Sequence, residues 1–224
     1  MAAALYQTRM SYFSFLRQHF GFLLFGFLMM GLSNFGQTFF ISLYSAEIRA
    51  EFGLTNAGFG GLYSAMTLLS AFAMVYTGRF IDSWSLRRFT VFVLLALAGG
   101  CLMMGLTQHV VALGLALFML RHFGQGLASH TGMTSAARAF SERRGQAVSL
   151  VQLGYASFEG FLPLLAVLVI AWLGWQQSWL LYAAIILGVA VPLQSVLVGF
   201  EPKPETSEAE GESAKDANRS DVLR

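Results

Sequence analysis

The stretch Gly78-Arg79-Phe80-Ile81-Asp82-Ser83-Trp84-Ser85-Leu86-Arg87-Arg88 fixes the topology of the chain. It places three arginines and one aspartate between two long apolar runs, which is typical of a short turn between membrane helices. Arginine at the end of an apolar span holds that end on the cytoplasmic side. Gly78 precedes the aspartate by four residues, where it would let two helix ends approach closely. We therefore predict a cytoplasmic turn here and orient the other segments from it.

The composition excludes a soluble globular domain. Of 224 residues, 56% are hydrophobic and only 12% are charged, and the mean hydropathy is +0.60. The net charge of +2 is too small to indicate nucleic acid binding. The single cysteine, Cys101, lies in an apolar run and cannot form an intrachain disulfide. The first apolar run is longer than the core of a signal peptide, so we expect no cleaved leader.

Apolar runs along the chain predict six membrane-spanning helices. A hydrocarbon core of ~30 Å needs about 20 helical residues at 1.5 Å each. The predicted spans cover residues 19–43, 58–80, 89–107, 110–136, 146–172 and 178–200. Residues 1–18 precede them as a basic cytoplasmic segment. Residues 201–224 follow as a polar tail with seven acidic residues, which predicts a disordered cytoplasmic linker, with a partner-binding tail as the alternative.

Arginine and lysine gather in alternate connections, which orients the spans. Only Arg49, in the predicted loop 45–57, lies on the opposite side. The positive-inside rule makes the basic face cytoplasmic and places both termini inside, so we expect an integral protein of a bacterial inner (plasma) membrane. The basic residues on the cytoplasmic side are Arg9, Arg17, Arg79, Arg87, Arg88, Arg138, Arg143, Arg144, Lys203, Lys215, Arg219 and Arg224.

The arginine-rich turn resembles the signature loop of the major facilitator superfamily. The shared pattern is Gly78-x-x-x-Asp82-x-x-x-x-Arg87-Arg88 between the second and third spans. The chain departs from the family at two serines after the aspartate, where a basic residue and a glycine are usual. The resemblance implies that Gly78, Asp82, Arg87 and Arg88 form a gating loop that latches two halves of a transporter in one access state.

Further motifs resemble the same family over residues 20–200. Arg121-x-x-Gly124-x-Gly126 in the fourth span is similar to its second motif. The predicted loop Gly174-Trp175-Gln176-Gln177 is similar to its Gly-Trp-rich connection before the sixth helix. Pro163 in the fifth span is loosely similar to a Gly-Pro motif.

The resemblance implies an all-α fold that is half of a transporter. Family members have twelve helices in two halves, each built of two inverted three-helix repeats around a central cavity. This chain matches one half, followed by a tail that resembles the central linker. It would then be a split or truncated transporter, or it would pair with a second six-helix half or with a copy of itself.

Two charged residues lie in the middle of predicted spans. Arg121 precedes Arg138 by 17 residues, and Glu159 follows Arg144 by 15. Helical rises of roughly 25 and 22 Å place both at the same depth. Because ionisable groups inside a membrane are costly and usually face a cavity or each other, we expect the two residues to face one interior and to be coupled. A purely structural ion pair is the alternative.

Polar residues at helical spacing extend this site along three spans. The resemblance implies that helices one, two, four and five line the cavity, so these stripes would converge there. His122 and His130 are interpreted as packed residues and not as sites. The predicted cavity residues are Asn34, Gln37, Arg121, Gln125, Gln152, Tyr155 and Glu159.

These residues favour transport of a small solute across the lipid bilayer. Arg121 would hold an anion in the fixed fork of its guanidinium. Glu159 would take up and release a proton as its surroundings change. We therefore predict alternating-access transport of a small organic anion coupled to protons. The alternative is a non-transporting membrane subunit or a truncated remnant of a transporter.

Enzymatic motifs are missing from the sequence. The four histidines are scattered, and neither a His-Glu-x-x-His spacing nor a phosphate-binding glycine loop followed by lysine occurs. We predict a protein that is not an enzyme and has no cofactor, no metal and no nucleic acid partner.

Overall fold

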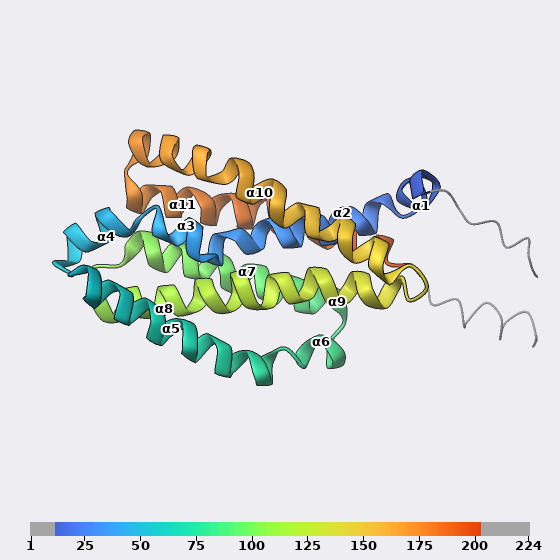
Figure 1. The fold of residues 1–224 in the computed structure, drawn as a ribbon, viewed down its shortest axis with the longest axis horizontal. Helices are drawn as coiled ribbons and strands as arrows, with labels where there is room; N and C mark the ends of the chain where they lie inside the picture. The colour runs from blue at the N-terminus through green and yellow to red at the C-terminus, as the bar shows by residue number, and fades with distance from the viewer. Residues whose placement is uncertain (1–11, 203–224) are drawn as a thin grey trace, which may run out of the picture.

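The computed structural model describes residues 12–202, which form a bundle of helices (Figure 1). Six helical segments are long and apolar enough to cross a membrane, which confirms the predicted all-α class. They cover Phe20–Ser42, Asn56–Ser83, Leu86–Leu106, Val110–Ala139, Arg144–Leu173 and Trp175–Phe200. The predicted linker from residue 203 onward lies outside the described residues.

Several spans contain more than one helix. The first comprises α2 (Phe20–Leu32), the 3-10 turn η2 (Ser33–Gly36) and α3 (Thr38–Ser42). The second comprises α5 (Asn56–Thr77) and α6 (Phe80–Ser83), and the third is α7 (Leu86–Leu106). The fourth comprises α8 (Val110–Met119), the π-helix η3 (Leu120–Ala128) and α9 (Ser129–Ala139). The fifth is α10 (Arg144–Leu173). The sixth comprises α11 (Trp175–Ile185), the π-helix η4 (Ile186–Ala190), α12 (Val191–Leu197) and the 3-10 turn η5 (Val198–Phe200). Outside the spans lie α1 (Tyr12–Gln18) and α4 (Ser45–Phe52).

The first span is not the continuous helix that we predicted. Gln37 has an extended backbone, with φ −80° and ψ 151°, and separates η2 from α3. Just before it, the side chains of Ser33 and Asn34 bond back to carbonyls of the preceding turn. Such local bonds compete with regular helix, and Gly36 lowers its stability further. The break lies in the middle of the bundle, beside the fourth span.

Two predicted loops are largely helical. Residues 45–57 contain α4, which ends at Gly53 in the left-handed conformation with φ 63°. Thr55 then caps α5 by accepting a hydrogen bond from the Gly58 amide at 3.0 Å. The loop predicted at 174–177 is reduced to Gly174, whose φ of 83° allows the sharp reversal, and α11 begins at Trp175. The hydrophobic pattern missed α4 and the first turn of α11 because short amphipathic or aromatic turns carry a weak periodic signal.

An aromatic cluster anchors the first span on the sixth at the end of the bundle that carries α4. Phe40, Tyr44, Trp179 and Tyr182 pack with ring centroids 4.9 to 5.8 Å apart. The hydroxyls of Tyr44 and Tyr182 share a hydrogen bond of 2.8 Å. This packing holds α3 in place beyond the break.

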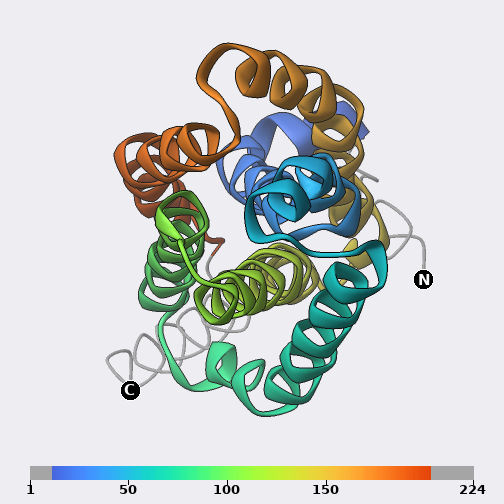
Figure 2. The ribbon, with the colours of Figure 1, turned by 90° about the vertical axis from the view of Figure 1, so that its left-hand side faces the viewer.

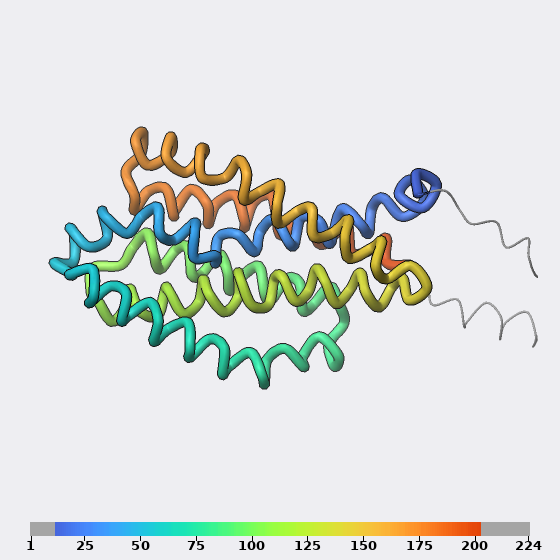
Figure 3. Tube along the Cα trace, in the orientation of Figure 1, coloured from blue at the N-terminus to red at the C-terminus, as the bar shows by residue number. Residues whose placement is uncertain are grey.

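The six spans are unequally buried. Figure 2, looking along the bundle, shows the first and fourth spans in the middle, α10 above and α5 below them on the right, and α7 and α11 on the left; Figure 3 shows the bundle from the side. Only 6% of the most apolar window of the second span is buried, and 11% of that of the fifth, against 67% in the first. The face between α5 and α10 is therefore the open side of the bundle.

Candidate functional site

Arg121 extends from η3 toward the break in the first span. Its Nη1 donates to the Gly36 carbonyl at 3.0 Å and to Thr38 Oγ1 at 3.3 Å. The Thr38 hydroxyl oxygen also accepts a hydrogen bond of 2.8 Å from Tyr63 on α5. The guanidinium lies over the Tyr63 ring, 5.3 Å from its centroid, in a cation–π contact. Residues of the first and second spans thus hold the Arg121 side chain of the fourth span in one position.

One edge of the Arg121 guanidinium has no partner among residues 12–202. The residue is only 7% exposed, and its buried Nε makes no hydrogen bond in this part of the chain. Both hydrogen bonds of the group use Nη1, so the edge formed by Nε and Nη2 is available. A carboxylate meets this edge with two parallel hydrogen bonds. Among the described residues, no carboxylate forms an ion pair with Arg121.

A close crossing of two glycines sets the position of Arg121. A Cβ atom on Gly36 would lie 2.1 Å from the Leu120 carbonyl oxygen and 2.5 Å from the Gln125 amide. A Cβ on Gly124 would lie 2.8 Å from the Gly36 backbone. The backbones of η2 and η3 therefore touch, as small residues allow in membranes. A Cβ on Gly126 of the same motif would lie 3.3 Å from the Met74 sulfur of α5.

Glu159 does not pair with Arg121 in this structure, so the structural ion pair considered from the sequence is not formed. Glu159 lies on the exposed side of α10 and interacts with Tyr155, one turn earlier. Helical rise gave equal depths for the two residues but carried no information about the direction in which each side chain points. The role predicted for Glu159 stays a prediction.

The other predicted cavity residues separate into two groups. Asn34 is fully buried, and its Nδ2 donates to the Tyr155 carbonyl at 3.3 Å, which ties the first span to α10. Gln37 is half-buried at the break, beside the groups that hold Arg121. Gln152 is exposed on α10. The residues on the first and fourth spans come together, whereas Gln152 and Glu159 lie on the open side.

A cavity of about 810 Å³ lies at the basic end of the bundle, which we define as the end with the α6 turn and the α9–α10 connection (Figure 1). Gln125, predicted from the sequence, lines its inner part, and its buried Oε1 has no hydrogen-bond partner. Ser129 and Thr134 were not predicted from the sequence, and His130 was predicted to be a packed residue. Their helical spacing from Gln125 to Arg138 is the signal that could have found them. The lining residues are Met74, Gln125, Gly126, Ser129, His130, Met133, Thr134, Ala137, Arg138, Arg144 and Val148.

The predicted gating loop contacts the fourth span. Asp82 on α6 forms an ion pair with Arg138 at the end of α9, with both side chains more than half exposed. A smaller cavity of about 440 Å³ lies beside this pair and is also lined by Gly78, Arg79 and His130. Arg87 and Arg88 at the start of α7 are exposed. The charged loop is therefore joined to the wall of the larger cavity.

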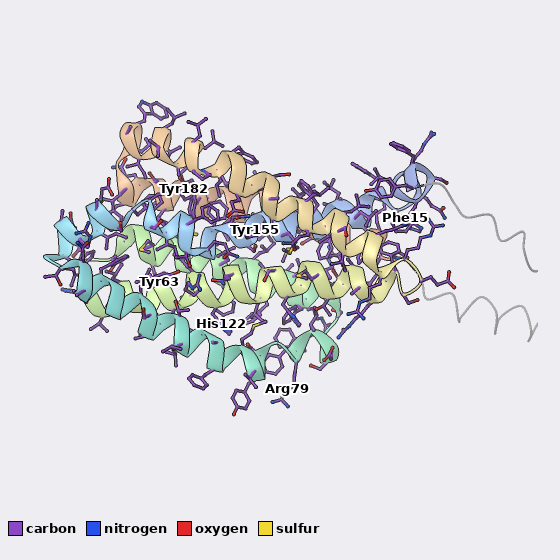
Figure 4. The ribbon with its side chains drawn as sticks, in the orientation of Figure 1. Phe15, Tyr63, Arg79, His122, Tyr155 and Tyr182 are labelled. Atoms are coloured by element: carbon purple, nitrogen blue, oxygen red, sulfur yellow. The ribbon has the colours of Figure 1, made fainter. Side chains whose placement is uncertain are left out.

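His122 ties α5 to the π-helix, in agreement with its interpretation as a packed residue. It is 2% exposed and stacks on Phe118. Its Nδ1 lies 3.3 Å from the Ser70 carbonyl, and its Nε2 lies 3.1 Å from the Thr77 hydroxyl. Because a carbonyl only accepts, Nδ1 donates to the Ser70 carbonyl. Figure 4 labels His122 of η3 and Tyr63 of α5, which lie between these two helices.

Residues 12–202 contain no group of three or more His, Cys, Asp or Glu side chains that could hold a metal ion. The polar chemistry of the site in this part of the chain is that of hydroxyls, amides and one buried guanidinium.

A six-span bundle with a buried cation and a polar cavity is a membrane protein built around an internal polar site. The chain belongs to the Major Facilitator Superfamily, whose sequence model matches residues 22–223. This confirms the family indicated by the motifs. An oxalate:formate antiporter from Oxalobacter formigenes is 25% identical over 185 residues, which are 82% of this chain and 43% of that protein. The chain thus spans less than half the length of this curated relative. No solved structure matches the present chain.

Proposed function

We propose that this chain is a six-helix half of a secondary transporter that binds a small carboxylate at Arg121 and moves it by alternating access. The observation that carries the proposal is the guanidinium itself, which is anchored through Nη1 and leaves its Nε–Nη2 edge unpaired in a buried position.

A buried cation without a counter-ion is unfavourable, and an anionic ligand would offset that cost. The planar edge of a guanidinium matches a carboxylate. Tyr63 and Thr38 hold the group in one orientation, so little rotamer freedom is left to lose on binding. The site therefore favours a planar anion over a neutral solute.

The named relative supports the same class of substrate. Its name gives oxalate and formate, two small carboxylates, and exchange as the mode of transport. We infer carboxylate transport for the present chain, with anion exchange as the simplest form of coupling. Proton coupling through Glu159 is the second form, supported by the exposure of this carboxylate on the open side, next to Tyr155.

The open side supports a partner in the membrane. The spans formed by α5 and α10 are almost unburied along their apolar windows. A second six-helix half or a second copy of this chain would cover them. We further propose two inverted three-helix repeats, a bacterial inner membrane as the location, and a cytoplasmic basic end with both termini inside.

Binding to the purified chain tests the site without requiring a complete transport cycle. We expect oxalate to bind the full chain in detergent and Arg121→Met to remove the Arg121 site, which lowers the number of oxalate ions bound per chain. The control Arg17→Gln removes one exposed arginine at the basic end and should bind normally. Equal binding to Arg121→Met and the control would refute the assignment of Arg121.

Transport is then measured in proteoliposomes. Oxalate uptake driven by internal formate, and unaffected by Glu159→Gln, would support exchange. Uptake that requires an imposed pH gradient and is lost in Glu159→Gln would support proton coupling. Oxalate binding without uptake under either condition would show that the six-helix chain alone is not sufficient and would favour the non-transporting alternative for the isolated chain.

A further inference from the structure

We propose that the cavity at the basic end holds a second anion site, in which a small carboxylate pauses on its way to Arg121. We call it the vestibule site and define it by His130, Thr134, Arg138 and Arg144. The proposal rests on the proposed function, because this second site would bind the same substrate before it reaches Arg121.

The vestibule site has the size and shape of a binding site. Its volume of about 810 Å³ falls within the range of roughly 300 to 1,000 Å³ that is usual for small-molecule pockets. One wall is a continuous stripe of α9 that carries His130, Thr134 and Arg138. The opposite wall is the first turn of α10, where Arg144 lies. A small anion and several waters would fit between them.

The charges around the vestibule site favour an anion. Asp82, which lines the adjoining cavity, is already paired with Arg138. Glu142, two residues before Arg144, forms no ion pair with the described residues. Arg79, in the adjoining cavity, stacks on the Tyr76 ring. Arg144 has no ion-pair partner among the described residues. One positive charge on the cavity wall is thus left without a counter-ion, and a cleft of this sign concentrates anions.

His130 stands at the wall between the two cavities. Its Nδ1 lies 3.3 Å from the Thr134 hydroxyl, and its Nε2 faces Gly78 of the gating loop, 3.8 Å from where a Cβ would lie. The ring therefore contacts both the lining of the vestibule site and the loop that carries Asp82. This position makes the imidazole a direct reporter of an anion bound next to it.

The inner end of the cavity lies close to Arg121 in the sequence of the fourth span. Gln125 lies at its inner end, one helical turn from Arg121, and offers a carboxamide whose oxygen is buried and unpaired. Its amide protons can donate to an anion that leaves Arg144. The vestibule site and the Arg121 site thus lie along one side of the fourth span.

The test uses the full chain labelled with ¹⁵N-histidine and titrated with oxalate, with oxamide as the neutral analogue. The His130 signals are assigned by their loss in His130→Gln. We expect them to shift saturably with oxalate and not with oxamide. Arg144→Gln should weaken the apparent affinity about threefold to fivefold, the effect expected of one partly exposed charge pair. The matched control, Arg17→Gln, should leave the affinity unchanged.

Arg121→Met separates the two sites. If the His130 shift persists in this variant, the vestibule site binds independently, as proposed. If Arg121→Met abolishes the shift, a single site at Arg121 explains the data, and the vestibule proposal is wrong while the proposed function stands. Equal shifts with oxamide, equal effects of the Arg144 and Arg17 variants, or no shift with oxalate would also overturn it. Oxalate binding by the parent chain and Arg121→Met decides the proposed function separately.

Discussion

Replacing Gly36 with alanine tests whether the glycine crossing holds Arg121. The added Cβ would lie 2.1 Å from the Leu120 carbonyl oxygen and 2.5 Å from the Gln125 amide. These neighbours are backbone atoms of η3, so they cannot move aside by a change of rotamer. The first and fourth spans must therefore separate at the level of the site.

The size of the effect follows from the geometry. To bring the 2.1 Å contact to an ordinary 3.4 Å, the two backbones must move apart by about 1.3 Å. That shift would break the 3.0 Å hydrogen bond from Arg121 Nη1 to the Gly36 carbonyl. A hydrogen bond to a charged group is worth ~1.5–3 kcal/mol, and overpacking adds ~1–3 kcal/mol. We expect Gly36→Ala to lower the free energy of unfolding by about 3–5 kcal/mol.

Unfolding by SDS in mixed micelles, followed by tryptophan fluorescence, measures this change. The matched control is Gly160→Ala in the interior of α10, where a Cβ would meet nothing within 4 Å. This control should be neutral or stabilising by up to about 1 kcal/mol. Oxalate binding at the Arg121 site should be lost in Gly36→Ala and retained in the control. If both variants unfold within about 1 kcal/mol of each other, the crossing does not hold the site as we argue.

Three further predictions concern the loop, the packed histidine and the orientation. Asp82→Asn should change the unfolding free energy by less than about 1 kcal/mol because both partners of the ion pair are more than half exposed. Oxalate uptake should nevertheless fall in this variant. Exchanging the two charges in the double variant Asp82→Arg/Arg138→Asp should restore the uptake. His122→Phe keeps a ring in place but removes both hydrogen bonds to α5, and should lower stability by ~1–3 kcal/mol in the SDS assay, whereas unchanged stability would show that these bonds contribute nothing. In intact cells an impermeant maleimide should label Asn56→Cys and not Ser83→Cys, which are exposed toward opposite ends of the bundle; the opposite pattern would reverse the topology.

The number and rough limits of the spans were predictable because the membrane imposes one strict rule. Each crossing must satisfy its backbone internally, so its length and apolar character show in the sequence. The break at Gln37 was not predictable in the same way. It is stabilised by Arg121, which lies 83 residues from Thr38 along the chain, and no local pattern reports such a contact.

The site was predicted in part for a related reason. A charged residue is easily recognised within an apolar run, so Arg121 was predicted as a site residue directly from the sequence. The depth of Glu159 followed from helical rise, but the direction of its side chain depends on how α10 is rotated against α2. His130 and Thr134 were visible as a polar stripe with Gln125. Polar residues also pack between membrane helices, so the stripe alone did not distinguish a cavity wall from a packed interface.

The contacts of Arg121 connect the open side of the bundle to the buried site. Tyr63 belongs to α5, the least buried span, and it holds Thr38, which in turn holds the guanidinium. A shift of α5 relative to the first span would change both the hydrogen bond and the cation–π contact. A ligand can favour one conformation only by binding it more tightly than the other. A partner on the open side would pack directly on α5. We therefore infer that the movement of α5 and the affinity of Arg121 for an anion are linked through Tyr63.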